Sequence, residues 1–237
     1  MEVYKNLKIK KKHTNSVVAI GNFDGIHLGH QKVINQAKEK AKKKRLSFGI
    51  ITFEPMPAMF FNSKIKNHRI NSFSQKKKQL EKLKLDFLVV IKFNRKFSKL
   101  SPQNFIQKII HKIAKCKYLY VSNNFKFGFK RKGNIKTLKK YSNFYQYKTI
   151  VAKPLKKITR VVSSTMIRRK ISQGKIYEVN RLLNRNWSIQ GKIIRGNRRG
   201  RKIGFPTCNI KISDYVIPRL GVYAVTVETS KFTKKGI

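Results

Sequence analysis

Short apolar runs alternate along this chain with segments of helical period, and this order constrains the fold more than any other feature. The runs cover residues 17–20, 47–53, 87–93, 117–121 and 147–152, and they are rich in Val, Ile and Phe. Strands that alternate with helices form a parallel sheet whose faces the helices cover. We therefore expect an α/β fold built on a parallel sheet.

The helical segments carry their own signals. The first places Val33, Ile34, Ala37 and Ala41 on one face. A later one begins with Ser101 as the expected N-cap and Pro102 at the first helical position, and then repeats apolar residues from 105 to 113. From residue 184 onward short strand-like runs are separated by glycines, which predicts a second, β-rich module. The expected domains are therefore 1–183 and 184–237.

The chain is strongly basic, with 57 Lys and Arg against 9 Asp and Glu and a net charge of +48. A nucleic-acid-binding protein usually gathers its cations on one face, whereas here they occur throughout the sequence. We interpret the lysine runs at 10–12, 42–44 and 76–78 as element ends or solvated faces. Weak, salt-sensitive binding to nucleic acid is still expected from the charge. Hydrophobic residues at 40% argue against a disordered basic chain.

The two cysteines, Cys116 and Cys208, lack the spacing of a disulfide framework or a zinc site. The N-terminal apolar run is too short for a signal peptide or a membrane span. We therefore expect a cytoplasmic protein with no membrane insertion.

A glycine-rich loop, G-N-F-D-G-I-H-L-G-H at residues 21–30, directly follows the first expected strand and leads into the first helix. Helix N-termini at this position bind anions, and glycines let the backbone approach a phosphate closely. His27 and His30 lie one helical turn apart, so both imidazoles can donate hydrogen bonds to phosphate oxygens. Two other interpretations stay open: a zinc site, although Asp24 is the only carboxylate nearby, and simple loop and cap residues without a ligand.

This loop resembles the H-x-G-H motif of nucleotidyltransferases, and its full string resembles the bacterial FAD synthetase family, whose members are bifunctional riboflavin kinases and FMN adenylyltransferases. Other strings in the same order are similar to that family: F-E-P-M-P at 53–57, V-S-N-N-F-K-F-G at 121–128, V-V-S-S-T-M-I-R at 161–168, G-F-P-T-C-N at 204–209 and G-V-Y-A at 221–224. The resemblance implies a Rossmann-like nucleotidyltransferase domain followed by a partial riboflavin-kinase β-barrel. It implies transfer of AMP from ATP to FMN with Mg²⁺ and release of pyrophosphate.

The resemblance also implies roles for individual residues. His27, His30 and Arg168 are the expected catalytic residues. The ATP phosphates are assigned to Gly21, Asn22, Phe23, Asp24, Gly29, Ser163, Ser164 and Thr165, and FMN to Glu54, Asn124, Phe125 and Phe127. The family commonly carries an acid at the position of Asn124, and Met56 replaces a residue that is often polar.

From the residues alone, different interpretations of the same positions stay open. Ser163 or Ser164 is equally suited to be an ordinary N-cap, and Arg168 to be a solvated charge. The alternating Phe125, Phe127 and Phe129 are compatible with one face of a core strand as well as with flavin contact.

In the kinase module the resemblance assigns nucleotide and Mg²⁺ binding to Thr207 and Asn209, and it places the catalytic glutamate further downstream than Ile237. We therefore expect that this chain alone does not phosphorylate riboflavin, and that a separate chain is one way to complete the barrel. Two alternatives to FAD synthesis remain: nucleotidyl transfer to another phosphorylated acceptor, and a basic nucleic-acid-binding protein that has lost catalysis.

Overall fold

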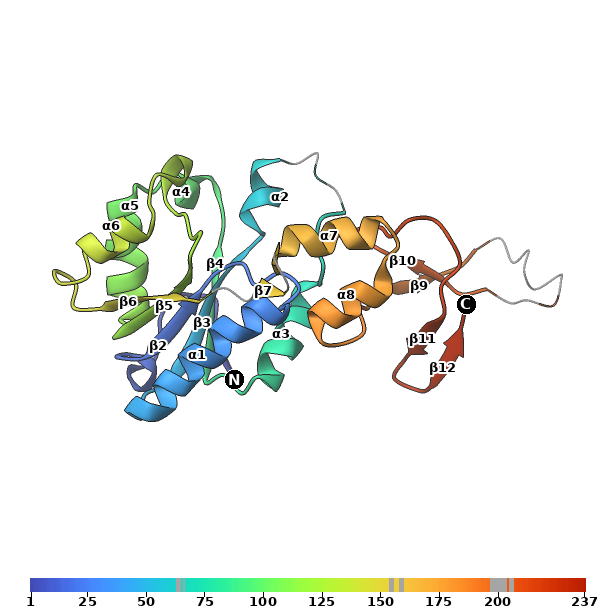
Figure 1. Cartoon of the computed structure of the whole chain (residues 1–237), viewed down its shortest axis with the longest axis horizontal. Coiled ribbons are helices and arrows are strands. Elements are labelled where there is room, and N and C mark those ends of the chain that lie inside the picture. Colours follow the sequence, from blue (N-terminus) through green and yellow to red (C-terminus); the bar gives the residue numbers. More distant parts are fainter. Residues whose placement is uncertain (63–64, 66, 154–155, 158–159, 197–203, 205–206) are drawn as a thin grey trace.

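A six-stranded parallel sheet forms the centre of the larger part of the molecule (Figure 1). The computed structural model describes the chain except residues 63–64, 66, 154–155, 158–159, 197–203 and 205–206. The strands run in the order β1-β4-β3-β2-β5-β6, and every neighbouring pair is parallel. Their bounds are β1 (Glu2–Tyr4), β2 (Val17–Ile20), β3 (Phe48–Glu54), β4 (Phe87–Lys92), β5 (Tyr118–Ser122) and β6 (Lys148–Ala152). The predicted parallel α/β fold is confirmed, with β1 added at one edge.

Helices connect the strands and continue beyond the sheet. They are α1 (Leu28–Lys44), α2 (Pro57–Phe61), α3 (Phe73–Lys82), α4 (Arg95–Ser98), α5 (Pro102–Phe105), α6 (Ile135–Lys140), α7 (Ser164–Ser172) and α8 (Ile176–Leu183). Single 3₁₀ turns lie at η1 (Lys11–His13) and η3 (Phe129–Arg131). Ser101 caps α5 as predicted, accepting a hydrogen bond from the Asn104 amide at 3.1 Å. The helix then widens into a π-helical segment, η2 (Ile106–Ala114).

Alternate residues of the central strands bury themselves on opposite faces of the sheet. On one face, strand residues such as Val18, Val89 and Val121 pack against η2 and α6. On the other, residues such as Ala19 and Ile50 pack against α1 and α3. Nearly continuous burial of β2 to β5 is typical of parallel strands covered on both sides.

The C-terminal residues form two separate antiparallel strand pairs, distant from the parallel sheet in Figure 1. One joins β9 (Lys192–Ile194) to β10 (Asn209–Lys211), and the other joins β11 (Val225–Glu228) to β12 (Thr233–Gly236). A further short pair joins β7 (Lys156–Lys157) to β8 (Arg160–Val161). Apolar side chains such as Ile193, Leu220 and Val222 are exposed here. Phe205 and Pro206 of the 204–209 string lie outside the described residues.

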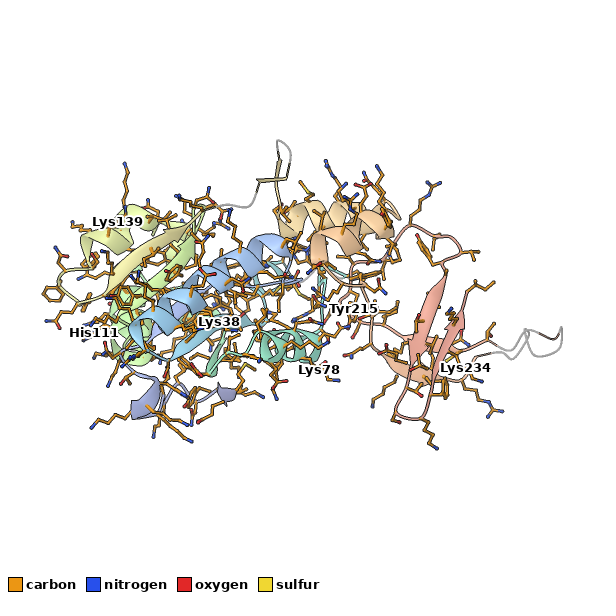
Figure 2. All side chains as sticks on the ribbon, turned by 60° about the horizontal axis from the view of Figure 1, so that its bottom comes forward. Lys38, Lys78, His111, Lys139, Tyr215 and Lys234 are labelled. Carbon is orange, nitrogen blue, oxygen red and sulfur yellow. The ribbon has the colours of Figure 1, made fainter. Side chains whose placement is uncertain are left out.

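A third apolar cluster joins the two parts of the chain. Ile167 and Ile171 of α7 and Val179 of α8 pack with Ile70 and with Val216 from the C-terminal part. Figure 2 shows Tyr215 beside this junction and lysine side chains pointing outward from both parts. Of the described helices, none is long and apolar enough to cross a bilayer.

One lysine departs from the predicted solvated face. Lys76 in α3 is only 1% exposed, and its Nζ donates a hydrogen bond to the main-chain oxygen of Asn22 at 3.0 Å. The interpretation of 76–78 as solvated is therefore wrong for Lys76, although it holds for the exposed Lys78. The long lysine stem reaches the glycine-rich loop through the apolar packing beneath it.

Candidate active site

The glycine-rich loop follows β2, the strand at which the order of strand addition reverses. After β2 the chain moves to β3 on one side and later returns to β5 on the other. The connections from adjacent strands diverge here and leave a crevice at the carboxyl ends of the strands. Within the loop, Gly25 has a φ of +82°, and an added Cβ would lie 3.0 Å from the Ile70 side chain. A glycine is thus required both for this turn and for this contact.

His27 and His30 stack on each other, with ring centroids 3.7 Å apart. The Nδ1 of His27 accepts a hydrogen bond from the His30 amide at 3.3 Å. A neutral His27 therefore carries its proton on Nε2, where it can be donated. Among the described residues, the Nδ1 of His30 is buried without a hydrogen-bond partner. Burial, aided by Arg168 and Arg185, lowers the pKa of His27 to about 4, and burial lowers the pKa of His30 well below its usual value. Both imidazoles are neutral near pH 7.

Asp24 and Arg168 form a partly buried ion pair that links the glycine-rich loop to helix α7. The Nη2 of Arg168 lies 2.7 Å from Oδ2 of Asp24, whose side chain is 2% exposed. The Nε of Arg168 donates to the main-chain oxygen of His68 at 2.8 Å. The Asp24 carboxylate also accepts the Ile70 amide at 3.2 Å. Arg168 is therefore held in one orientation and is not a freely solvated charge.

The loop that precedes α7 contacts the glycine-rich loop directly. Ser164 Oγ donates to the main-chain oxygen of Asp24 at 2.9 Å. A Cβ on Gly29 would approach the Val162 carbonyl oxygen to 3.0 Å, so the backbones are nearly in contact. Ser163 is the N-cap of α7 and accepts the Met166 amide at 3.3 Å. The N-cap interpretation thus holds for Ser163, whereas Ser164 bridges the loops.

A cavity of about 690 Å³ opens between these loops. It brings together most of the predicted site: Gly21, Asn22, Phe23, Asp24, His27, Gly29, His30, Asn124, Phe125, Phe127, Ser163, Ser164, Thr165 and Arg168. Glu54 is not among its lining residues, because its carboxylate pairs with Arg69. Thr207 and Asn209 lie in the exposed C-terminal part.

Aromatic side chains form part of the cavity wall. Phe125 lines the cavity and stacks on Phe127 with a centroid separation of 5.6 Å, while Phe127 itself is buried in the core. The strand interpretation of this stretch is wrong: the described residues here form turns and a single bridge between Phe127 and Gly133. Phe93 and Phe97 also line the cavity and had not been predicted. Their signal was a phenylalanine at the end of the 87–93 run and a second one four residues later.

Three polar residues that sequence reasoning missed support or line the site. Arg185 donates to the Gly25 carbonyl at 2.7 Å, and burial lowers its pKa to about 10. Lys76 holds the Asn22 carbonyl from below. His68 lines the cavity beside Arg168. None belongs to a recognisable motif, since each lies in a Lys-, Arg- or Asn-rich stretch that looks like surface.

The electrostatics of the cavity suit anions. Its lining includes the cations Lys126, Lys130, Arg131 and Arg168, and Asp24 is the only carboxylate among the described lining residues. Across the part of the chain that is described, no three His, Cys, Asp or Glu side chains cluster as a metal site would need. The zinc interpretation therefore finds no support in these residues.

Family models and a solved structure match this chain over most of its length. A family model described as FAD synthetase matches residues 9–166, and one described as riboflavin kinase matches residues 183–237. A solved structure described as a macrolide-efflux protein from Streptococcus pneumoniae has a TM-score of 0.84 at 29% identity, covering 98% of this chain and 76% of that one.

Curated relatives cover most of the chain. A bifunctional riboflavin kinase/FMN adenylyltransferase of Buchnera aphidicola subsp. Schizaphis graminum is 40% identical over 96% of this chain and 73% of its own length. Proteins of the same name from Listeria monocytogenes and Escherichia coli K12 are 38% and 32% identical, over 94% and 89% of this chain and 71% and 67% of their own lengths. The chain belongs to the FAD synthetase family, the bifunctional riboflavin kinase/FMN adenylyltransferases.

Proposed function

We propose that this chain transfers AMP from MgATP to FMN and releases pyrophosphate, forming FAD. One observation carries the proposal: His27, His30 and Arg168 line a single cavity at the sheet's switch point, although Arg168 comes from a loop far along the chain. The alternative of a different phosphorylated acceptor uses the same phosphate machinery and is separated from FMN by experiment.

The reaction is an in-line displacement at the α-phosphorus of ATP. A phosphate oxygen of FMN forms the new P–O bond while the bond from the α-phosphorus to the bridging oxygen breaks and pyrophosphate leaves with the electron pair. Such a reaction gains mainly from positioning and from neutralising the charge that develops on the leaving group. It needs no covalent intermediate on the protein.

The residues divide this work by charge. The neutral imidazoles of His27 and His30 donate hydrogen bonds to phosphate oxygens at the N-terminus of α1, where the helix dipole also favours an anion. Arg168 supplies the fixed positive charge on the opposite loop, and Asp24 keeps its guanidinium aligned. Thr165, exposed at the start of α7, is available to the same phosphates.

The acceptor end of the cavity fits a flavin by its chemistry. Phe125, Phe93 and Phe97 offer ring faces and edges to an isoalloxazine, and Lys126, Lys130 and Arg131 offer charge to its phosphate. Asn124, which accepts a hydrogen bond from Ser122 at 2.9 Å, is proposed as a polar contact to FMN. Glu54 is reassigned to a supporting role through Arg69.

Mg²⁺ is proposed to enter the site as part of the MgATP substrate. Among the described lining residues the one carboxylate, Asp24, is already occupied by Arg168 and Ile70. The described lining of the cavity therefore lacks a free carboxylate for Mg²⁺, and the ion is proposed to arrive bound to the ATP phosphates.

The remaining expectations stay predictions: the domain boundary at 183/184, a cytoplasmic location, weak nucleic-acid binding, a separate chain that completes the barrel, and nucleotide binding by Thr207 and Asn209. The loss of riboflavin kinase activity in this chain is proposed on the exposure of β9 to β12, which form two unconnected pairs.

The test is a direct assay. The protein is mixed with FMN, MgATP and pyrophosphatase, and FAD is measured by chromatography, with nicotinamide mononucleotide and phosphopantetheine as competing acceptors. We expect FAD alone to accumulate. His27→Ala and His30→Ala are expected to abolish it while circular dichroism stays native. FAD formation at the full rate by either variant would refute the roles assigned to the two histidines. Faster reaction with another acceptor would show that FMN is not the preferred substrate.

A further inference from the structure

The described part of the chain contains a contact that reaches from the C-terminal module into the adenylyltransferase site. Residues 214–216, here called the strap, run alongside residues 68–71, here called the bracing segment. The Arg69 amide donates to the Asp214 carbonyl at 2.6 Å, and the Val216 amide donates to the Arg69 carbonyl at 2.9 Å. These two bonds make a parallel bridge between Arg69 and Tyr215. The strap thus binds both backbone groups of Arg69.

Tyr215 and Val216 of the strap are buried, unlike Asp214 and the strands around them. Tyr215 is 3% exposed and Val216 is 7% exposed, whereas β9 to β12 are largely exposed. The Tyr215 hydroxyl donates to Gln75 Oε1 at 2.8 Å and accepts the Gln190 amide at 3.2 Å. Val216 packs into the cluster of Ile70, Ile167 and Ile171. This short piece is therefore a specific docking element.

The bracing segment also contacts the ion pair of Asp24 and Arg168. The carbonyl of His68 accepts from Nε of Arg168 at 2.8 Å, and the amide of Ile70 donates to Asp24 at 3.2 Å. His68 and Ile70 are the residues directly before and after Arg69 in the sequence. The two partners that orient the Arg168 guanidinium, His68 and Asp24, are thus both connected to the residue that the strap binds.

Charge reinforces the same connection. Arg69 is mostly buried, pairs with Glu54 at the end of β3, and lies 3.8 Å from the Asp214 carboxylate. Arg69 therefore joins the sheet, the bracing segment and the strap. Displacing the strap frees the amide and carbonyl of Arg69 and removes one of its carboxylate neighbours.

We propose that the strap is a positioning element of the adenylyltransferase site, and that Tyr215 is a positioning residue for Arg168. This inference rests on the proposed function and extends it: residues outside 1–183 align the arginine that neutralises the leaving pyrophosphate. A shift of about 1 Å in a positioned group can reduce the rate about a hundredfold.

The experiment uses the full chain with Tyr215→Ala, the milder Tyr215→Phe, and Tyr223→Phe as the matched control. Tyr223 lies in the same module, and its hydroxyl contacts only the Arg219 carbonyl among the hydrogen bonds of the described residues. For FAD formation we expect kcat to fall between about tenfold and about a hundredfold in Tyr215→Ala. Tyr215→Phe is expected to fall less, Tyr223→Phe not at all, and the KM for FMN to change less than kcat in each.

Coupling to Arg168 separates positioning from general damage. In an Arg168→Lys background, which cannot make both the Asp24 and His68 contacts, Tyr215→Ala is expected to cause little further loss of kcat. An equal loss in both backgrounds, or no loss in the native one, would overturn the proposal. If Tyr215→Ala does not fold, the same comparison with Tyr215→Phe decides.

A readout without catalysis keeps the two proposals distinguishable. Exchange of the Arg168 Nε–H with solvent is followed by NMR, and pyrophosphate affinity by calorimetry. Faster exchange and weaker pyrophosphate binding in Tyr215→Ala than in Tyr223→Phe would support the positioning role of the strap, even if the protein makes no FAD. Absence of FAD formation would refute only the proposed function. Unchanged exchange and affinity would refute the strap.

Discussion

Ser164 Oγ donates a hydrogen bond to the main-chain oxygen of Asp24 at 2.9 Å, although the two residues are 140 positions apart. This contact connects the glycine-rich loop to the N-terminus of α7. Ser164→Ala removes it and leaves the ion pair of Asp24 with Arg168 in place. We expect a loss of about 1 kcal/mol in the free energy of unfolding and about tenfold in kcat for FAD formation. Urea denaturation and steady-state kinetics measure both, and an unchanged kcat would show that the loops hold together without this bond.

The neutral histidines predict a dependence of stability on pH. The pKa of His27 is about 4 in the folded protein, below the ordinary value of 6.5. Between those values the unfolded chain binds more protons, so the free energy of unfolding rises with pH and levels off above about pH 7. His13, His30 and His68, whose pKa values are also lowered, act in the same direction.

His27→Asn removes one of these titrating groups. We expect the slope of unfolding free energy between about pH 5 and about pH 6.5 to decrease by about 1 kcal/mol per pH unit. His111→Asn is the comparison, because the His111 imidazole packs beside Tyr145 and is not among the residues that line the cavity. Equal slopes for native protein and His27→Asn would mean that His27 titrates normally.

We expect the substitution Gly29→Ala to lower kcat while leaving the stability of the fold nearly unchanged. A Cβ there would lie 3.0 Å from the Val162 carbonyl and 3.1 Å from the His27 ring. Alanine improves helix propensity by about 1 kcal/mol, which offsets part of the crowding. We expect Gly29→Ala to unfold at nearly the native urea concentration but to lose at least about tenfold in kcat, because the two loops and His27 are pushed apart.

The matched variant for this test is Gly221→Ala. An added Cβ there meets nothing closer than 3.9 Å. We expect both its kcat and its unfolding midpoint to be native. Full activity in Gly29→Ala would show that the crevice tolerates wider spacing of the loops.

Lys76 is a buried cation whose described hydrogen bond goes to the Asn22 carbonyl. Burial lowers its pKa, so the charge is costly to the fold. Lys76→Met keeps the stem and removes the charge, and we expect stability to change by less than about 1 kcal/mol. We expect kcat to fall about tenfold, since Asn22 loses its anchor. Lys78→Met, on the exposed face, is the control; equal kcat in both variants would deny Lys76 a role.

The exposed C-terminal strand pairs indicate that this chain does not phosphorylate riboflavin. For these 237 residues we expect no FMN from riboflavin and MgATP under conditions in which FAD forms from FMN, because β9 to β12 leave their apolar side chains exposed. Chromatography of the reaction mixture measures FMN and FAD together. FMN formation by this chain would show that the two strand pairs suffice for a kinase site.

The sequence predicted the parallel strands, and it predicted the loops that line the cavity, because the signals for both are local. Apolar runs between polar turns mark buried parallel strands, and the glycine-rich loop is recognised from consecutive residues. The edge strand β1 was missed because Glu2–Tyr4 is short and lacks an apolar run. The π-helical widening of η2 was missed because its apolar spacing is the same as that of an α-helix.

The supporting residues of the site could not be predicted from local pattern. Lys76 lies in a run of three lysines, and only the tertiary fold decides that one of them turns inward. Glu54 was assigned to FMN from its motif, yet its carboxylate pairs with Arg69. Long-range pairing of this kind depends on which loops meet, and single-sequence patterns carry no information on that.

The position of β2 between β3 and β5 has a thermodynamic consequence. In the proposed function, a nucleotide bound at the end of this strand touches loops from both halves of the sheet, so its binding requires that the halves are assembled. Each tenfold rise of free nucleotide above its dissociation constant then adds about 1.4 kcal/mol against global opening. We therefore expect added MgATP to slow the digestion of this chain by a protease.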